Sequence, residues 1–229
     1  EAETLEIDAV DAVTGALVTL VYTVFEKYPV MTKSVRVKNT SDKTMFIERV
    51  FSSCNDFPTM DYDMITLWGR HVKERNVERR PLAHGVQGAE SKRGVSGHSQ
   101  NPFVALASHG ANEEYGEVYG FNLVYSGNFS ALAECDHNCS TRLIMGINPN
   151  DFEWTLEPDE TFWAPEVVCV YTDKGIGEMS RIFHRLSRGF CMNYEERICR
   201  NPLPERDNPS VLCRQLYILP GIIRWLLNP

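Results

Sequence analysis

The sequence predicts an all-β protein, a large antiparallel β-sandwich (a supersandwich) that ends in one linker helix. Three observations support this fold class. Apolar and polar residues alternate in several short segments, which is the pattern of strands with one buried face. Turn-forming residues punctuate the intervals between these segments. Near residue 180 the apolar residues instead repeat with the period of a helix.

The strand prediction depends on four segments in which every second residue is apolar: 18–24, 35–37, 119–125 and 143–147. Alternation of this kind is typical of antiparallel sheets, whose strands bury one face and expose the other. Turn signals rich in Pro, Gly, Asn and Asp stand at 27–29, 39–42, 126–128, 148–150 and 157–159. Many short strands at such intervals predict a sandwich or a barrel.

Residues 68–100 do not show this alternation of short strands and turns. They combine Arg and Lys with five glycines, and no sustained alternation crosses them. We expect long connections here, around one or two short strands. Long connections in a compact domain are usually functional or interfacial.

One helix is predicted from Gly177 onward. Met179, Ile182, Phe183 and Leu186 form an apolar stripe with a 3.6-residue period, and Phe190 extends it. Gly189 is a plausible stop, because helices commonly end at glycine. We therefore expect a β-sandwich over 1–175, a linker helix over 176–200 and a separate tail over 201–229.

Composition excludes several classes of partner. The 229 residues carry a formal net charge of −8, which disfavours nucleic acid, since phosphate binding requires clustered Lys and Arg. The longest apolar stretches are shorter than a membrane span, so no membrane partner is expected. Seven scattered cysteines predict mostly free, buried thiols rather than a disulfide framework. Secreted and cytoplasmic locations both stay open.

Three Asn-x-Ser/Thr sequons begin at Asn39, Asn128 and Asn138. They are either glycosylation acceptors or chance sequences in polar turns. Both interpretations stay open on the sequence alone.

Several residue clusters invite a chemical interpretation. Retaining glycosidases need two carboxyl groups about 5–5.5 Å apart, and the acidic residues 61, 63, 74 and 78 are numerous enough to pair. In a segment rich in Lys and Arg, however, we expect them to be surface or salt-bridged groups. The arginines at 75, 79 and 80, together with Glu74 and Glu78, could bind an anion, but an interdomain or subunit ion-pair network is the preferred interpretation.

Two further clusters are better explained by structure than by chemistry. Cys135-Asp-His-Asn-Cys139 lacks the second ligand pair of a zinc site and predicts a turn between two strands. A disulfide between the two cysteines is the alternative under oxidising conditions. Ser96, His98 and Ser99 suggest a hydrolase, but Gly94-Val-Ser-Gly97 is not a nucleophile elbow. No metal or cofactor is expected.

The tryptophans at 68, 154 and 163 could stack on sugar rings. Trp154 and Trp163 fall in hairpin-like segments, so we expect a core or interface role for these two.

Long, ordered sequence stretches resemble one family. They include Glu3-Thr-Leu-Glu-Ile7, Glu74-Arg-Asn-Val-Glu-Arg-Arg-Pro-Leu82, His98-Ser-Gln-Asn-Pro-Phe103, residues 116–129 and residues 146–184. Together they closely resemble the N-terminal β-sandwich domain of glycoside hydrolase family 36, the large α-galactosidases. The similarity extends from the first residues to about Arg188.

The resemblance implies a non-catalytic portion of a retaining enzyme that hydrolyses terminal α-galactosyl residues of melibiose- and raffinose-type oligosaccharides. In the family the two catalytic carboxylates belong to a (β/α)-barrel, and the nucleophile follows a Lys-Trp pair. No Lys-Trp-Asp occurs in this sequence, so we expect no catalytic residue and an inactive chain. The partners implied are galactosides, the barrel domain and further subunits of a homotetramer.

Three departures from the family pattern matter. The family's earliest strands are expected before Glu1. At the rim of the family's sugar pocket a Trp is typical, and in Leu67-Trp-Gly-Arg-His-Val-Lys-Glu-Arg75 that position is His71, the candidate substrate-binding residue. After Leu212 the sequence departs abruptly from the family, which suggests truncation. The alternatives are a stand-alone carbohydrate-binding or interaction module, or a degenerate gene product.

Overall fold

The computed structural model describes residues 2–200, with side-chain environments as far as Gly189. Its largest element is a nine-stranded sheet in the order β1-β2-β3-β15-β10-β9-β6-β7, with β14 paired to β3 beyond that path. Its strands are β1 (Ala2–Asp11), β2 (Ala16–Phe25), β3 (Val30–Asn39), β6 (Tyr62–Arg70), β7 (Lys73–Pro81), β9 (Gln100–Ser108), β10 (Val118–Leu123), β14 (Thr161–Trp163) and β15 (Val167–Thr172).

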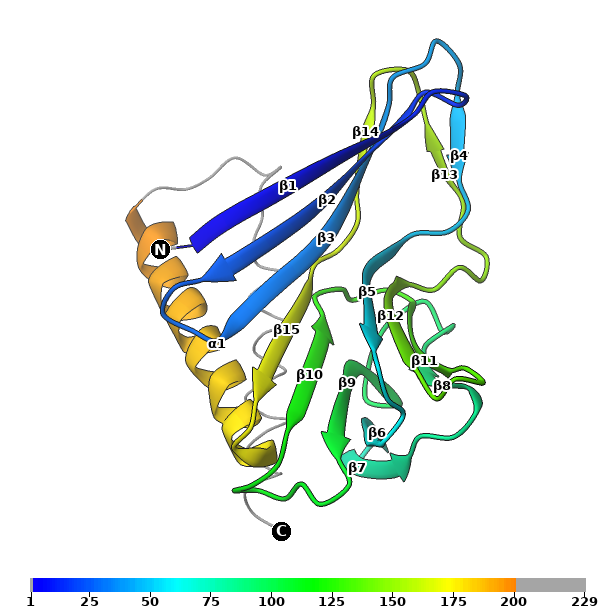
Figure 1. Cartoon of the computed structure of the whole chain (residues 1–229). Helices are drawn as coiled ribbons and strands as arrows, with labels where there is room; N and C mark the ends of the chain where they lie inside the picture. The colour runs from blue at the N-terminus through cyan, green and yellow to red at the C-terminus, as the bar shows by residue number, and fades with distance from the viewer. Residues whose placement is uncertain (1, 201–229) are drawn as a thin grey trace.

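A four-stranded sheet in the order β5-β12-β11-β8 lies against part of this large sheet (Figure 1). Its strands are β5 (Phe51–Phe57), β8 (Gly85–Glu90), β11 (Phe129–Cys135) and β12 (Thr141–Ile147). A short pair, β4 (Met45–Ile47) and β13 (Trp154–Leu156), lies at one end of the molecule. All pairings between these strands are antiparallel, which confirms the predicted fold class.

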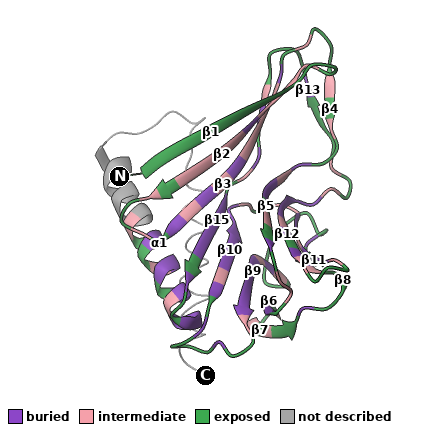
Figure 2. Cartoon of the chain, viewed as in Figure 1, coloured by how far each residue is buried: buried purple, intermediate pink, exposed green. Residues whose placement is uncertain are grey.

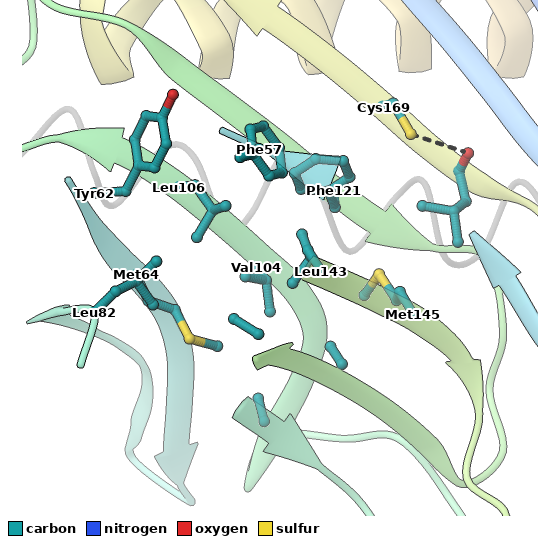
Figure 3. Packing of buried hydrophobic residues seen from close by; sticks show 14 of the residues in the cluster. Phe57, Tyr62, Met64, Leu82, Val104, Leu106, Phe121, Leu143, Met145 and Cys169 are labelled. Carbon is teal, nitrogen blue, oxygen red and sulfur yellow. Dashed lines mark hydrogen bonds between the residues drawn. The ribbon is translucent and has the colours of Figure 1, made fainter. Parts of the chain in front are cut away.

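The two sheets enclose the main hydrophobic core. Figure 3 shows Phe57 of β5, Leu143 and Met145 of β12, and Phe121 of β10 converging from opposite sheets. Phe129, Leu123 and Leu143 are fully buried. Each of these three side chains points inward from a strand whose residues alternate between the two faces of its sheet. The period-two pattern of the sequence therefore creates this buried layer between the sheets.

The helix α1 (Gly175–Arg200) covers the opposite face of the large sheet. Its predicted stripe is confirmed, because Met179, Ile182, Phe183 and Leu186 are all buried. The predicted stop at Gly189 is wrong, because the helix continues to Arg200. A Cβ at Gly189 would lie 2.5 Å from the Tyr28 hydroxyl, so this glycine permits a close helix contact instead of ending the helix.

Strands β1, β2 and β3 extend beyond the small sheet, and we call these three strands the wing. All ten residues of β1 are exposed, and β2 is mostly half-buried (Figure 2). A third cluster of buried residues, around Phe162, Leu156 and Val50, covers the far end of β3. The sandwich is therefore asymmetric, with nine strands facing four.

The prediction for residues 68–100 is wrong in its main feature. Instead of long connections the structure has a regular hairpin, β6 and β7, followed by β8, and only residues 91–99 form an extended loop.

The core role expected for Trp154 and Trp163 is also wrong, since both side chains are exposed. The guanidinium of Arg36 lies 4.8 Å from the Trp163 ring centroid on the surface. An interface role for these two residues stays a prediction.

Asn39 is completely buried, and its side-chain amide donates to the carbonyl oxygens of Lys43 (2.7 Å) and Leu156 (2.9 Å). Interpretation of this sequon as a glycan acceptor is therefore wrong for the folded protein, because the acceptor nitrogen is engaged. Asn138 lies in an exposed turn.

The four cysteines with described side chains, at 54, 135, 139 and 169, are free thiols as predicted, but only Cys135 and Cys169 among them are buried, whereas Cys54 and Cys139 are exposed. No helix among the described residues is both long and apolar enough to cross a membrane. The predicted tail over 201–229 lies outside the described residues.

Candidate functional site

The candidate substrate-binding residue His71 lies at the turn between β6 and β7, where its side chain is exposed. We call residues 68–76 the hairpin tip. It contains a second exposed ring, Trp68, at the end of β6. The hairpin lies at the edge of the large sheet, since β7 is its last strand (Figure 1).

The backbone of the hairpin tip is strained at two positions. Val72 has φ = 67° and Arg75 has φ = 58°, both in the left-handed region that branched or long side chains rarely adopt. Each such conformation costs about 1–3 kcal/mol and is found preferentially at functional sites. Gly69 is required by close approach, because a Cβ there would lie 2.6 Å from the Lys73 carbonyl oxygen.

Side-chain hydrogen bonds hold this conformation. Glu74 accepts a hydrogen bond from the Val72 amide at 2.9 Å. That bond, which favours the ionised carboxylate, lowers the pKa of Glu74. Asn76 donates through its amide nitrogen to the carbonyl oxygens of Trp68 (3.2 Å) and Lys73 (3.0 Å), which ties the two strands together.

Arg75 is the partly buried cation of the hairpin tip. Desolvation lowers the pKa of its guanidinium, although Glu74 opposes this shift. Its Nε is buried and has no hydrogen-bond partner among the described residues. Exposed rings beside polar groups suit the binding of a hydroxyl-rich ligand. Glu74 is the one acidic residue of the hairpin tip, and its carboxylate accepts a hydrogen bond from the Val72 backbone amide. This arrangement does not suit acid–base chemistry.

The acidic and basic residues around the hairpin form structural pairs. Asp63 accepts hydrogen bonds from Arg79 Nε and from His109 Nδ1, both at 2.7 Å. Glu78 lies 3.7 Å from Arg80 at the surface. Within the described residues these contacts centre on Asp63. The interdomain or subunit ion-pair network expected for the arginines with Glu74 and Glu78 stays a prediction. His109 was not predicted from the sequence, because it lies 46 positions from Asp63 along the chain.

The other predicted clusters have structural roles. Ser96 donates its hydroxyl to the Tyr125 carbonyl oxygen at 3.0 Å, and Ser99 accepts from Arg93 at 3.3 Å. His98 instead lies near enough to Glu74 to favour its ionised form. Residues 91–99 form an extended loop without a strand-to-helix turn, so no nucleophile elbow is present there.

The Cys135–Cys139 segment forms the turn that was predicted, between β11 and β12. Asp136 accepts hydrogen bonds from the amides of Asn138 and Ser140, both at 2.9 Å. Cys135 is buried beside Thr141, whereas Cys139 is exposed. Within residues 2–189, no three His, Cys, Asp or Glu side chains gather in a way that could hold a metal ion.

A groove of about 940 Å³, not predicted from the sequence, lies between β3 and β5. Its wall includes Phe57, Tyr119 and Tyr171, and the rings of the two tyrosines have centroids 4.9 Å apart. Lys33 donates to Asn55 Oδ1 at 2.5 Å where β3 and β5 approach each other. The groove thus combines aromatic faces with a few polar groups, which is typical of ligand sites.

Comparison with known proteins gives a consistent result. Residues 1–157 match the model of the glycosyl hydrolase family 36 N-terminal domain. Alpha-galactosidase AgaA of Geobacillus stearothermophilus is 49% identical over 212 residues, which are 93% of this chain and 28% of that protein. Alpha-galactosidase C of Emericella nidulans is 39% identical over 212 residues, 93% of this chain and 27% of its own length. The chain therefore spans little more than a quarter of these relatives.

Solved structures agree with this match. The crystal structure of GH36 α-galactosidase AgaA from Geobacillus stearothermophilus superposes with a TM-score of 0.81 at 53% identity, covering 82% of this chain and 26% of that one. Variants of the same enzyme have been solved in complex with raffinose and with stachyose. The galactosidase domain of the α-galactosidase–sucrose kinase AgaSK gives a TM-score of 0.80 at 42% identity, covering 82% and 26% of the two chains.

Proposed function

Because the chain belongs to the family of glycosyl hydrolase family 36 N-terminal domains, we propose that it serves as the non-catalytic sandwich of an α-galactosidase. The intact enzyme would release terminal α-galactosyl residues from melibiose- and raffinose-type oligosaccharides. The observation that carries this proposal is the match to AgaA, 53% identical at a TM-score of 0.81. AgaA variants are known with raffinose and stachyose bound.

In this proposal the sandwich packs on a catalytic barrel and supports a homotetramer, and no residue of the chain cleaves the glycosidic bond. The hairpin tip forms part of the rim of the sugar pocket, with His71 at the family's Trp position. Its strained backbone at Val72 and Arg75 supports a functional role. An imidazole offers a smaller stacking face than an indole, so His71 would bind sugar more weakly than Trp.

A domain exchange tests this proposal. Residues 1–188 would replace the aligned segment of AgaA, and raffinose hydrolysis by the chimera would be measured. We expect an active chimera, and no activity from the 229-residue chain alone. A His71→Trp change in the chimera should lower the KM for raffinose about threefold to tenfold, with kcat little altered. Galactose release by the purified chain alone, with contaminating enzyme excluded, would contradict the proposal.

A second candidate function, a stand-alone carbohydrate-binding module, is favoured by the aromatic groove beside Tyr119 and Tyr171. Aromatic faces with adjacent polar groups can hold a sugar ring. Calorimetry of the isolated chain with melibiose distinguishes the two candidates. Saturable heat at millimolar ligand, lost in Tyr171→Ala, would favour the binding module. No heat would leave the enzyme-domain proposal as the better one.

A further inference from the structure

Trp68 differs from the two other exposed tryptophans, because nothing is stacked on its ring. Trp154 packs against Phe162 with ring centroids 5.3 Å apart, and the ring of Trp163 is covered by the guanidinium of Arg36. Among the side chains that the structure describes, no aromatic ring or cation stacks on Trp68, which is 39% exposed. Its indole therefore offers an apolar face to a flat ligand.

The strands on both sides fix the position of Trp68. It lies at the end of β6, directly opposite Asn76 of β7 and Gln100 of β9. Its backbone carbonyl oxygen accepts a hydrogen bond from Asn76 Nδ2 at 3.2 Å. His71, by contrast, lies in the turn itself. A side chain on a paired strand is held more precisely than one on a loop, so Trp68 is the better placed of the two rings of the hairpin tip.

Amide groups flank Trp68 on its own face of the sheet. Residues directly opposite each other on paired strands project to the same face, so Asn76 and Gln100 lie on either side of Trp68. The Asn76 amide nitrogen donates to the carbonyl oxygens of Trp68 and Lys73, which leaves its Oδ1 as an acceptor. Gln100 Oε1 is buried and has no donor among the described residues. A hydroxyl donor would be favoured beside either oxygen, because an unpaired buried acceptor costs free energy.

These features continue in one row across three neighbouring strands, at the side of the large sheet opposite the wing (Figure 1). The row consists of an acceptor, an open aromatic face and a second acceptor. A sugar ring has an apolar face and a rim of hydroxyl groups, which match the indole and the two amide oxygens respectively. The flanking amides carry no charge, so the row fits a neutral sugar better than an anionic one.

We propose that Trp68 is the sugar-stacking residue of the hairpin tip. Its indole covers one face of a hexopyranose unit of an α-galactoside, and hydroxyl groups of that unit donate to Asn76 and Gln100. This inference rests on the proposed function, which places the hairpin tip at the rim of a sugar pocket. It assigns the main aromatic contact to Trp68, and His71 makes only a minor one.

Saturation-transfer NMR of the full 229-residue chain with raffinose tests this inference directly. We expect a Kd on the order of 10 mM, since one stacked ring and two hydrogen bonds supply little free energy of binding. Trp68→Ala should weaken binding about threefold to tenfold, which corresponds to one aromatic contact, and Trp68→Phe should retain most of the affinity. Trp163→Ala is the matched control, because Arg36 already covers that ring, and its Kd should stay within about twofold. Tyr171→Ala should also leave the Kd unchanged, since the groove is a separate site.

The AgaA chimera separates this inference from the proposed function. In an active chimera, Trp68→Ala should raise the KM for raffinose about threefold to tenfold and leave kcat within about twofold. His71→Ala should change the KM by less than about twofold. An inactive chimera would count against the proposed function, and the NMR titration of the full chain would then decide the role of Trp68.

Circular dichroism would verify that each variant is folded, and Trp68→Leu replaces Trp68→Ala if the alanine variant fails to fold. Equal Kd values for Trp68→Ala and the parent would overturn the inference. Equal weakening by Trp163→Ala, or a larger loss in His71→Ala than in Trp68→Ala, would overturn it too. So would the lack of any saturable transfer from the full chain at about 100 mM raffinose.

Discussion

Replacement of Arg79 by alanine should destabilise the fold far more than the same change at its neighbour Arg80. Arg79 Nε donates to Asp63 at 2.7 Å, and its other nitrogens donate to the carbonyl oxygens of Ala111 (2.6 Å) and Ser108 (3.0 Å). Arg79 thereby joins the edge hairpin to the loop that follows β9. Among the described side chains, Arg80 has only the 3.7 Å approach to Glu78 at the surface.

The magnitude follows from burial. The Asp63 side chain is only 11% exposed, and that of Arg79 is 31% exposed. Removal of one partner from a fully buried ion pair costs about 3–5 kcal/mol. Asp63 would still accept from His109, and solvent reaches the Arg79 side of the pair. We therefore expect a loss of about 2–3 kcal/mol for Arg79→Ala. An exposed pair contributes about 0–1 kcal/mol, so Arg80→Ala should cost less than about 1 kcal/mol.

Urea unfolding followed by tryptophan fluorescence measures both free energies of unfolding. In thermal unfolding, the Arg79 variant should melt about 5–10 °C below the parent, since 1 kcal/mol corresponds to about 2–4 °C at this size. Arg79→Lys should recover only part of the loss, because a lysine cannot reproduce the forked geometry. If the free energies of unfolding of Arg79→Ala and Arg80→Ala differed by less than about 0.5 kcal/mol, the hydrogen bonds of Arg79 would have no energetic role.

Three further predictions concern the core, a thiol and acid stability. Gly120→Val should cost at least about 2 kcal/mol in urea unfolding, because a Cβ there would lie 2.7 Å from the Met179 sulfur and push α1 from the sheet. Burial raises the pKa of Cys169 to about 12, so iodoacetamide at pH 8 should label exposed Cys54 but not Cys169 until the protein unfolds; peptide mass mapping would detect either outcome. Hydrogen bonds from two arginines lower the pKa of Glu178. Its stabilising effect is present above the unfolded pKa of about 4.5 and is lost as pH falls through the lower folded pKa. Glu178→Gln should therefore flatten the stability–pH curve below pH 5, and an unchanged curve would contradict this reasoning.

The strands that bury one face could be predicted, because their pattern is local. Strand β7 could not be predicted, because its sequence, Lys73-Glu-Arg-Asn-Val-Glu-Arg-Arg-Pro81, places charged residues on both faces of the strand. It is the last strand of its sheet and has no buried face comparable to that of β10. Edge strands are commonly charged, so the alternation signal weakens where pairing is one-sided.

The contacts that shape the candidate sites were beyond sequence reasoning for a different reason. Gly189 was predicted to end the helix, but what decides its role is the Tyr28 hydroxyl, which arrives from the turn before β3. The partners Asp63 and His109 are 46 positions apart. The groove is likewise built from five strands that are scattered along the chain, β2, β3, β5, β10 and β15. Spacing along a sequence does not reveal such contacts. His71 was named through the family resemblance, and its place in a hairpin turn was not predicted, because β7 has no alternation signal.

The attachment of the wing through a single strand has a consequence for how the protein opens. Within residues 2–200, β1 pairs only with β2, and β2 joins the rest of the sheet only through β3, while β3 also pairs with β15 and β14. Amide hydrogens should therefore exchange with solvent in a fixed order. Those of β1 would exchange first through low-energy fraying, and those of β2 next. The amides of β9 and β10 would exchange only when the whole domain unfolds, because these strands lie in the middle of the sheet between both buried clusters.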